Sequence, residues 1–415
     1  MFFFEKAEKV LKSMKNLKDK LWTSSFISAC IGNFLLFFAF YLLVPIFPLY
    51  LIAEFQMSTS LVGVILATYT LAALLIRPLS GFVLDMFNRK PIYLAAYFLF
   101  VITFIGYPLV HLIGFFLVVR ILHGFTFGFV TTAANSLIVD IMPASRRGEG
   151  FGYFGVANNL AMALGPMVGL FVLDVYNFDF VFYIAIVSGL IGFMISTNIK
   201  SDKKVAKSIK QPIAFDRFFL AKGLSPGFCL FLMGIPYGMI VTYVAIYGKT
   251  IGIQSGVGFF FSLMAFGIIW SRILAGKMVD SGRLVQVIAY GTFICLLAVL
   301  MLSSIPKLTQ FHGLVIVSAF YALALVLGIG YGMIFPAYNT LFVNLAPHNR
   351  RATASSTYMT SWDLGIGLGL ILGGRISDTK LGLPFAYFVG AMGILLSFVV
   401  FYTIVGPYFE KNKLR

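Results

Sequence analysis

Long apolar runs alternate with short polar breaks along almost the whole chain. When Pro, Gly and charged clusters are taken as breaks, each run is close to the roughly 20 residues that cross a bilayer core of about 30 Å. Twelve such runs occur, at 25–50, 61–84, 91–110, 113–139, 150–173, 180–199, 226–248, 256–279, 286–304, 313–341, 353–377 and 384–406. The pattern predicts an all-α integral membrane protein with twelve transmembrane helices.

The composition agrees with this prediction. The 415 residues are 60% hydrophobic and only 11% charged, whereas a soluble domain carries about 25% charged residues. The first run is too long for a cleavable signal peptide, and no small-residue cleavage site follows it. Residues 1–24 form a separate segment that we predict to be a cytoplasmic amphipathic helix with a lysine-rich face. Binding of this helix to anionic lipid headgroups is the alternative.

The basic residues predict the orientation. With the N-terminus inside, every Lys and Arg falls on the inner side except Arg120, Lys249, Lys307, Arg375 and Lys380. By the positive-inside rule both termini are then cytoplasmic, and we expect a bacterial inner (cytoplasmic) membrane. The net charge of +16 therefore reflects topology and does not indicate nucleic-acid binding. Cys30, Cys229 and Cys295 fall inside spans, so neither a disulfide framework nor a metal site is indicated, and we expect no cofactor.

The two halves of the chain resemble each other. "IRPLSGFVLD" (76–85) aligns with "SRILAGKMVD" (271–280), which matches Arg77 with Arg272, and "VDIMPASRRG" (139–148) aligns with "VNLAPHNRRA" (343–352). The polar stretch "KSDKKVAKSIKQP" (200–212) separates six spans from six. This internal repeat predicts two pseudo-symmetric six-helix bundles. The expected parts are a segment 1–24, a first bundle 25–199, a linker 200–225, a second bundle 226–406 and a tail 407–415.

A parallel repeat of six spans is the architecture in which two bundles rock about a midplane site. The loop "GFVLDMFNRK" (81–90) also resembles the signature Gly-x-x-x-Asp-(Arg/Lys)-x-Gly-(Arg/Lys)-(Arg/Lys) of the major facilitator superfamily, with Met86 and Asn88 departing from it. The resemblance implies a conformational latch at the inner side, in which Arg89 pairs with Asp140. The predicted latch residues are Gly81, Asp85, Arg89, Lys90, Asp140, Asp280 and Arg283.

"AMALGPMVGL" (161–170) in the fifth span is similar to the Gly-x-x-x-Gly-Pro-x-x-Gly-Gly motif of exporters that exchange substrate for protons. Gly165, Pro166 and Gly169 match this motif. Pro softens a helix because it cannot donate to the preceding turn, and small residues let membrane helices pack closely. Plain helix packing is the alternative to an export role.

Three residues are candidates for proton coupling. Arg120 lies in the apolar run "FFLVVRILHGFTFG" (115–128), and the cost of charge in lipid requires it to face the protein interior. "RILHG" resembles the family's Arg-x-x-x-Gly motif, linked to proton transfer, although an Arg held by backbone carbonyls would fit equally. His123 follows one turn later and is either a proton carrier or a hydrogen-bonded filler. Asp363 is the deepest acid, about eleven residues into its span, where the first half has Asn159; the alternative is a structural Asp.

The family resemblance also implies which spans line the substrate cavity. The residues expected there are Asn33, Tyr41, Arg120, Asn158, Asn159, Tyr237, Tyr243, Tyr331, Asn339, Tyr358, Trp362 and Asp363. Aromatic side chains with few charges suit an amphipathic organic substrate.

The sequence therefore predicts a proton-coupled secondary exporter of small amphipathic compounds, including multidrug efflux, that works as a monomer by alternating access among membrane lipids. A flippase for lipids, a metabolite or metal-chelator transporter and a solute:proton symporter are the alternatives. An enzyme is not expected, because no Ser-His-Asp set, phosphate loop or ATPase domain is recognisable.

Overall fold

The computed structural model describes residues 20–143, 146–201, 220–310, 313–347 and 351–413. Most of the predicted segment 1–24 and of the linker 200–225 therefore lies outside the described residues. Within the described residues every regular element is a helix. The α-helices are α2 (Ser24–Leu43), α3 (Ile46–Phe55), α4 (Thr59–Met86), α5 (Arg89–Gly106), α6 (Ile113–Ile141), α7 (Arg147–Val175), α8 (Phe178–Thr197), α9 (Leu224–Thr250), α10 (Phe259–Asp280), α11 (Leu284–Ser304), α12 (Gly313–Leu345), α13 (Arg351–Ser377), α14 (Gly382–Val400) and α15 (Gly406–Asn412).

Each predicted span corresponds to one of these helices or to consecutive helices. The first span is α2 followed by α3, which are separated at Val44 and Pro45. The last span is α14 followed by a π-helical turn, Phe401–Val405, and α15. Eleven helical segments of the described chain are long and apolar enough to cross a membrane. The one predicted span that is not among these eleven, 353–377, is α13, whose 27 residues include several Ser, Thr and Gly and one Asp.

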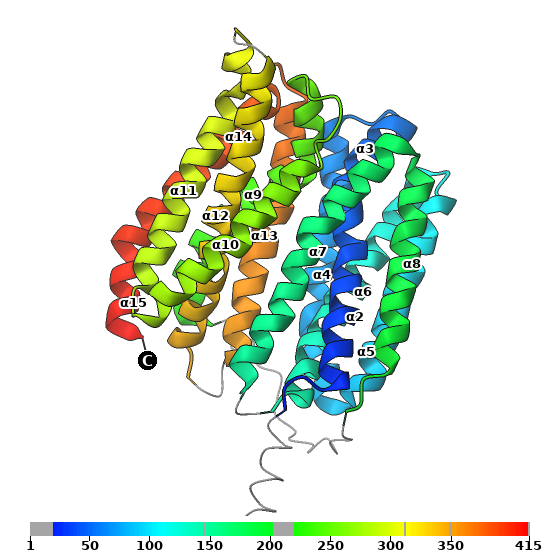
Figure 1. Cartoon of the computed structure of the whole chain (residues 1–415), viewed down its shortest axis with the longest axis vertical. Helices are drawn as coiled ribbons and strands as arrows, with labels where there is room; N and C mark the ends of the chain where they lie inside the picture. The colour runs from blue at the N-terminus through cyan, green and yellow to red at the C-terminus, as the bar shows by residue number, and fades with distance from the viewer. Residues whose placement is uncertain (1–19, 144–145, 202–219, 311–312, 348–350, 414–415) are drawn as a thin grey trace, which may run out of the picture.

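The spans form two bundles that stand side by side, as Figure 1 shows. In the first bundle α2 packs against α7 and α8, α4 against α6, and α5 against α6 and α8. In the second bundle α9 packs against α13 and α14, α10 against α12, and α11 against α12 and α14. The bundles meet along two interfaces, α4 with α13 and α7 with α10. The predicted fold of twelve transmembrane helices in two six-helix bundles is confirmed.

Both described ends of the chain lie at the same end of the molecule (Figure 1). We call this the basic end, because α5 begins there with Arg89 and Lys90 and α9 is preceded there by Lys222. The opposite end is called the far end.

The predicted glycine motif of the fifth span serves packing within the first bundle. Pro166 lies inside α7, and a Cβ at Gly165 would lie 2.8 Å from the backbone nitrogen of Leu42 in α2. At Gly169 the nearest atom would be the carbonyl oxygen of Leu42. Any larger side chain at these positions would push α7 away from α2, because contacts below 3.0 Å are essentially never made by a real Cβ.

Candidate functional site

The bundles are joined at the far end by two acidic side chains. Asp378, just after α13, accepts hydrogen bonds from the backbone N–H groups of Thr59 (3.0 Å) and Ser60 (2.7 Å) at the start of α4. Asp174 in α7 accepts one from the N–H of Gly256 (3.3 Å), just before α10. Carboxylates are stabilised at such positions because the first N–H groups of a helix have no partner within the helix.

The basic ends of the same helices are apart. In the part of the chain that the structure describes, no heavy atom beyond the helix itself and the chain neighbours lies within 4 Å of a Cβ built at Gly81 (α4), Gly152 or Gly155 (α7), or Gly276 (α10). A cavity of about 480 Å³ opens there between α7, α10 and α12. This volume lies within the roughly 300–1,000 Å³ typical of small-molecule pockets. Among the described residues, the molecule is therefore closed at the far end and open at the basic end.

The cavity wall combines apolar, aromatic and charged groups. It is formed by Glu149, Gly152, Tyr153, Val156, Arg272, Gly276, Val279, Pro336 and Thr340. None of the residues that we predicted for the cavity lies on this wall. Sequence reasoning missed Arg272 because it was counted among the inner-side charges. The signal that could have found it was its alignment with Arg77 in the repeat.

Asp363 lies at the other interface, where an ion pair connects the bundles. Its carboxylate accepts a hydrogen bond from the guanidinium of Arg77 in α4. The Asp363 side chain is 23% exposed and the Arg77 side chain is 14% exposed, so the pair is largely but not fully shielded from solvent. Towards the far end α4 and α13 are in close contact, since a Cβ at Gly367 would lie 3.2 Å from Thr70. Arg77 was predicted at the inner end of its span, but it lies nine residues before the end of α4, or about 13 Å of helix.

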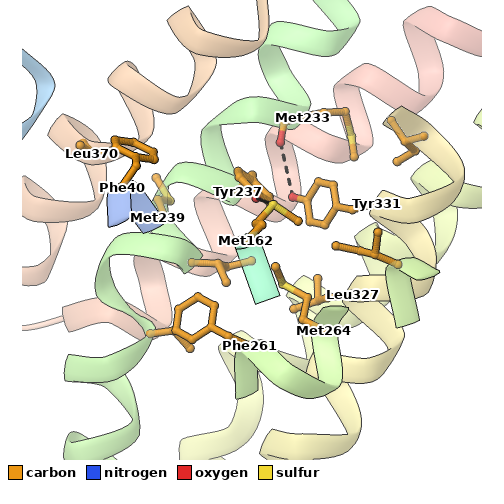
Figure 2. Close-up of a cluster of buried hydrophobic side chains, with 14 of the residues drawn as sticks. Phe40, Met162, Met233, Tyr237, Met239, Phe261, Met264, Leu327, Tyr331 and Leu370 are labelled. Atoms are coloured by element: carbon orange, nitrogen blue, oxygen red, sulfur yellow. Dashed lines mark hydrogen bonds between the residues drawn. The ribbon is translucent and has the colours of Figure 1, made fainter. Parts of the chain in front are cut away.

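An aromatic cluster lies on the far-end side of the cavity. It consists of Tyr237, Tyr331, Phe335 and Trp362. The ring centroid of Tyr237 lies 5.0 Å from Tyr331 and 4.8 Å from Trp362, and that of Phe335 lies 4.7 Å from Trp362. Met162 of α7 reaches this cluster from the first bundle, because the Tyr237 hydroxyl donates to its sulfur at 2.8 Å. Figure 2 shows Met162 beside Tyr237, and Tyr331 donating to the carbonyl oxygen of Met233. Methionine and aromatic side chains provide a polarizable, adaptable apolar surface.

Arg120 and His123 lie inside the first bundle. Arg120 is 4% exposed, and its guanidinium carbon stands 4.6 Å from the ring centroid of Phe47 and 4.5 Å from that of Tyr69. His123 is fully buried, and its Nδ1 is 2.7 Å from the hydroxyl of Tyr107. Neither residue lies on the wall of the cavity.

The other predicted cavity residues lie in several environments. Asn33 and Asn159 are buried, and neither of the two Asn33 side-chain polar atoms has a hydrogen-bond partner among the described residues. Tyr243 is buried and donates to the carbonyl oxygen of Leu370 at 2.7 Å, whereas Asn339 is exposed. The half-buried residues are Tyr41, Asn158, Tyr358 and Trp362.

The predicted latch is only partly described. Arg89 lies 2.9 Å from Asp140 and also donates to the carbonyl oxygen of Ser136 at 3.2 Å. Both helices belong to the first bundle, so this ion pair does not itself connect the two bundles. Lys90 donates to the carbonyl oxygen of Thr197 at the end of α8. Arg283 is exposed before α11, and the side chains of Asp85 and Asp280 lie outside the described residues.

Comparisons with known proteins agree with this architecture. The sequence model of the Major Facilitator Superfamily matches residues 29–370 and 308–414. The chain is 22% identical to a staphylopine export protein of Staphylococcus aureus over 352 residues, which cover 83% of this chain and 87% of that protein. It is 25% identical to the quinolone resistance protein NorA of Staphylococcus aureus over 403 residues, which cover 92% of this chain and 96% of that protein.

Solved structures show the same fold. A peptide transporter bound to alafosfalin has a TM-score of 0.78 at 16% identity, covering 94% of this chain and 96% of that chain. A D-xylose–proton symporter has a TM-score of 0.73 at 16% identity, covering 95% and 100%. These identities support a shared fold and carry no information about substrate. Together with the family match, they identify the chain as a transporter and not an enzyme: it belongs to the major facilitator superfamily.

Proposed function

We propose that this protein is a proton-coupled exporter of small amphipathic compounds. The observation that carries the proposal is the ion pair of Arg77 and Asp363, which joins the bundles at the interface of α4 and α13. A carboxylate in this position can accept a proton only by giving up its ionic contact with Arg77. Protonation would thus weaken a connection between the bundles and change the relative stability of their two arrangements.

The orientation supports export. If the basic end faces the cytoplasm, as the positive-inside rule indicates, the described structure is open to the cytoplasm and closed to the outside. The contact of Asp363 with Arg77 would then correspond to the state after a proton has been released inside, ready to accept a substrate from the cytoplasm. The relatives named for staphylopine export and quinolone resistance support the same direction and an organic substrate. The location proposed for this monomeric carrier is a bacterial inner membrane.

Asp363 and Arg77 have the central roles in this proposal. A proton taken up from outside neutralises Asp363, and Arg77 is released. After the bundles rock, the proton leaves to the cytoplasm and the ion pair forms again. The aromatic cluster and Met162 would hold the apolar part of the substrate, and Arg120 and His123 would stabilise the first bundle from within.

The test is substrate-triggered proton movement in everted membrane vesicles with an imposed pH gradient. Amphipathic cations, zwitterions and anions are added in turn to vesicles that contain wild type or Asp363→Asn. We expect at least one compound to collapse the gradient in wild type, with a loss of at least tenfold in Asp363→Asn, because an amide cannot carry the proton. Equal proton movement in the two would show that Asp363 is structural. No movement with any compound would contradict proton coupling altogether.

A further inference from the structure

The two interfaces between the bundles are related by the internal repeat, but they carry different charges. Arg77 and Arg272 are equivalent in the aligned stretches 76–85 and 271–280. The partner of Arg77 is Asp363, and the residue equivalent to Asp363 in the first half is Asn159. One interface therefore has an arginine and an acid, whereas the other has an arginine and an amide.

Arg272 has no counter-ion among the side chains that the structure describes. Its Nε is buried without a hydrogen-bond partner there, and the residue lies on the cavity wall. Glu149 on the same wall already accepts two hydrogen bonds from Arg146, both at 2.8 Å. Tyr358 lies near Arg272, but its hydroxyl donates to the carbonyl oxygen of Phe335 at 3.4 Å. Arg272 is half-buried, and its Nε is removed from water with no described anion to replace the lost hydration. A bound anion would compensate for that loss.

We infer that Arg272 is the binding site for a carboxylate group of the transported molecule, so that the substrates are amphipathic carboxylates, zwitterions included. The inference rests on the proposed function and specifies its substrate class. A guanidinium suits a carboxylate because its planar fork of donors forms two parallel hydrogen bonds. The apolar part of the molecule would lie against Tyr153 and Val156 on the same wall.

The position of Arg272 also relates substrate binding to the proposed proton site. Tyr358 lies near both Asp363 and Arg272. An anion at Arg272 would therefore bind within electrostatic range of the groups that surround Asp363. This arrangement gives the protein two charged centres, Arg272 on the cavity wall for the substrate and Asp363 at the other interface for the proton.

The test measures equilibrium binding with no pH gradient, so that its result does not depend on proton coupling. Radiolabelled naphthalene-2-carboxylate, naphthalene-2-carboxamide and 2-naphthylmethylamine are bound to the purified full-length protein in a scintillation-proximity assay, with protein-free beads as the blank. We expect wild type to bind the carboxylate at least tenfold more tightly than the carboxamide, since a hydrogen-bonded charged group contributes that much. Arg272→Gln is expected to bind both equally, and Arg272→Lys to retain part of the preference.

Two further variants keep the test decisive. Lys222→Gln removes one exposed positive charge from the same end and is expected to leave the preference unchanged. Asn159→Asp leaves Arg272 in place and adds a carboxylate at the position equivalent to Asp363. Because this carboxylate would compete with the bound anion for Arg272, the variant is expected to bind the carboxylate probe at least tenfold less tightly. The inference is overturned if Arg272→Gln or Asn159→Asp keeps the preference, if wild type prefers the amine, or if wild type binds none of the three probes. A preserved carboxylate preference in a protein that moves no protons would contradict the proposed coupling alone.

Discussion

Arg77 and Arg120 are both arginines in the apolar interior, but different groups surround their charges. Arg77 pairs with a carboxylate of the other bundle, whereas Arg120 stands over the rings of Phe47 and Tyr69. The sequence identified Arg120 because a charge inside an apolar run is conspicuous. It did not reveal the partner of Asp363, since a contact between residues 286 positions apart depends on how two bundles dock.

The aromatic environment of Arg120 predicts a structural role that can be measured. Nε and one terminal nitrogen of its guanidinium have no hydrogen-bond partner among the described residues. Arg120→Met fills a similar volume, so we expect it to keep most of the thermal stability. Arg120→Ala leaves a void in the packed interior, and large-to-Ala truncations there cost about 2–5 kcal/mol, so its apparent melting temperature should fall by roughly 5 °C or more.

Thermal melting curves of the purified variants, recorded by intrinsic fluorescence, test this expectation. An equal fall in melting temperature for Arg120→Met and Arg120→Ala would show that the charge of Arg120 itself stabilises the bundle. A stable Arg120→Met protein that no longer transports would instead support the proton-coupling role suggested by the sequence.

At the scale of elements, α13 combines several of the groups described above. It supplies Asp363 and Trp362, it is followed at once by Asp378, and it packs against α9 of its own bundle and α4 of the other. The sequence predicted its bounds within two residues, 353–377 against Arg351–Ser377. Its polar composition, which is unfavourable against lipid, follows from this position between the bundles.

The contact of Asp378 with the first N–H groups of α4 predicts a shift in conformation when it is removed. Asp378→Ala loses two hydrogen bonds, which at an exposed site contribute roughly 1 kcal/mol in total. The population open at the far end should then rise about fivefold. Spin labels at Gln56 and Lys380, which are both exposed, would report this as a larger share of long distances.

Asp174→Ala provides the matched comparison, because it removes a single and longer contact with Gly256 and should shift the distances less. An unchanged distance distribution in Asp378→Ala would mean that packing alone closes the far end.

For the whole molecule, the sequence predicted two bundles but not which of their arrangements the structure would adopt. The two arrangements share one sequence and differ by only a few kcal/mol, so no residue pattern distinguishes them. The predicted cavity residues illustrate this point. Tyr237 and Tyr331 are packed together in the arrangement described, while the open wall is formed nearer to the basic end by residues such as Tyr153 and Arg272.

Opening at the basic end predicts that bulk added there will block the cycle without unfolding the protein. Gly152 has open space around its Cβ position and lines the cavity. Gly152→Leu should therefore fold normally but obstruct closure of the basic end, so that transport in proteoliposomes falls at least tenfold while the melting temperature stays unchanged.

Gly114→Leu serves as the control, since Gly114 also has open space but lies at the start of α6, away from the cavity. Normal transport by Gly152→Leu would show that the bundles need not approach each other at this point.

The proposed proton site at Asp363 and the inferred anion site at Arg272 lie at separate interfaces, and this separation has an electrical consequence. If Asp363 carries one proton inwards for each carboxylate that leaves on Arg272, two positive charges move inwards in effect. Each charge contributes about 2.3 kcal/mol per 100 mV of membrane potential. The voltage across the membrane would then contribute about 4.6 kcal/mol per 100 mV to each cycle. An anion could thus be expelled against a steep gradient even where the two sides have the same pH.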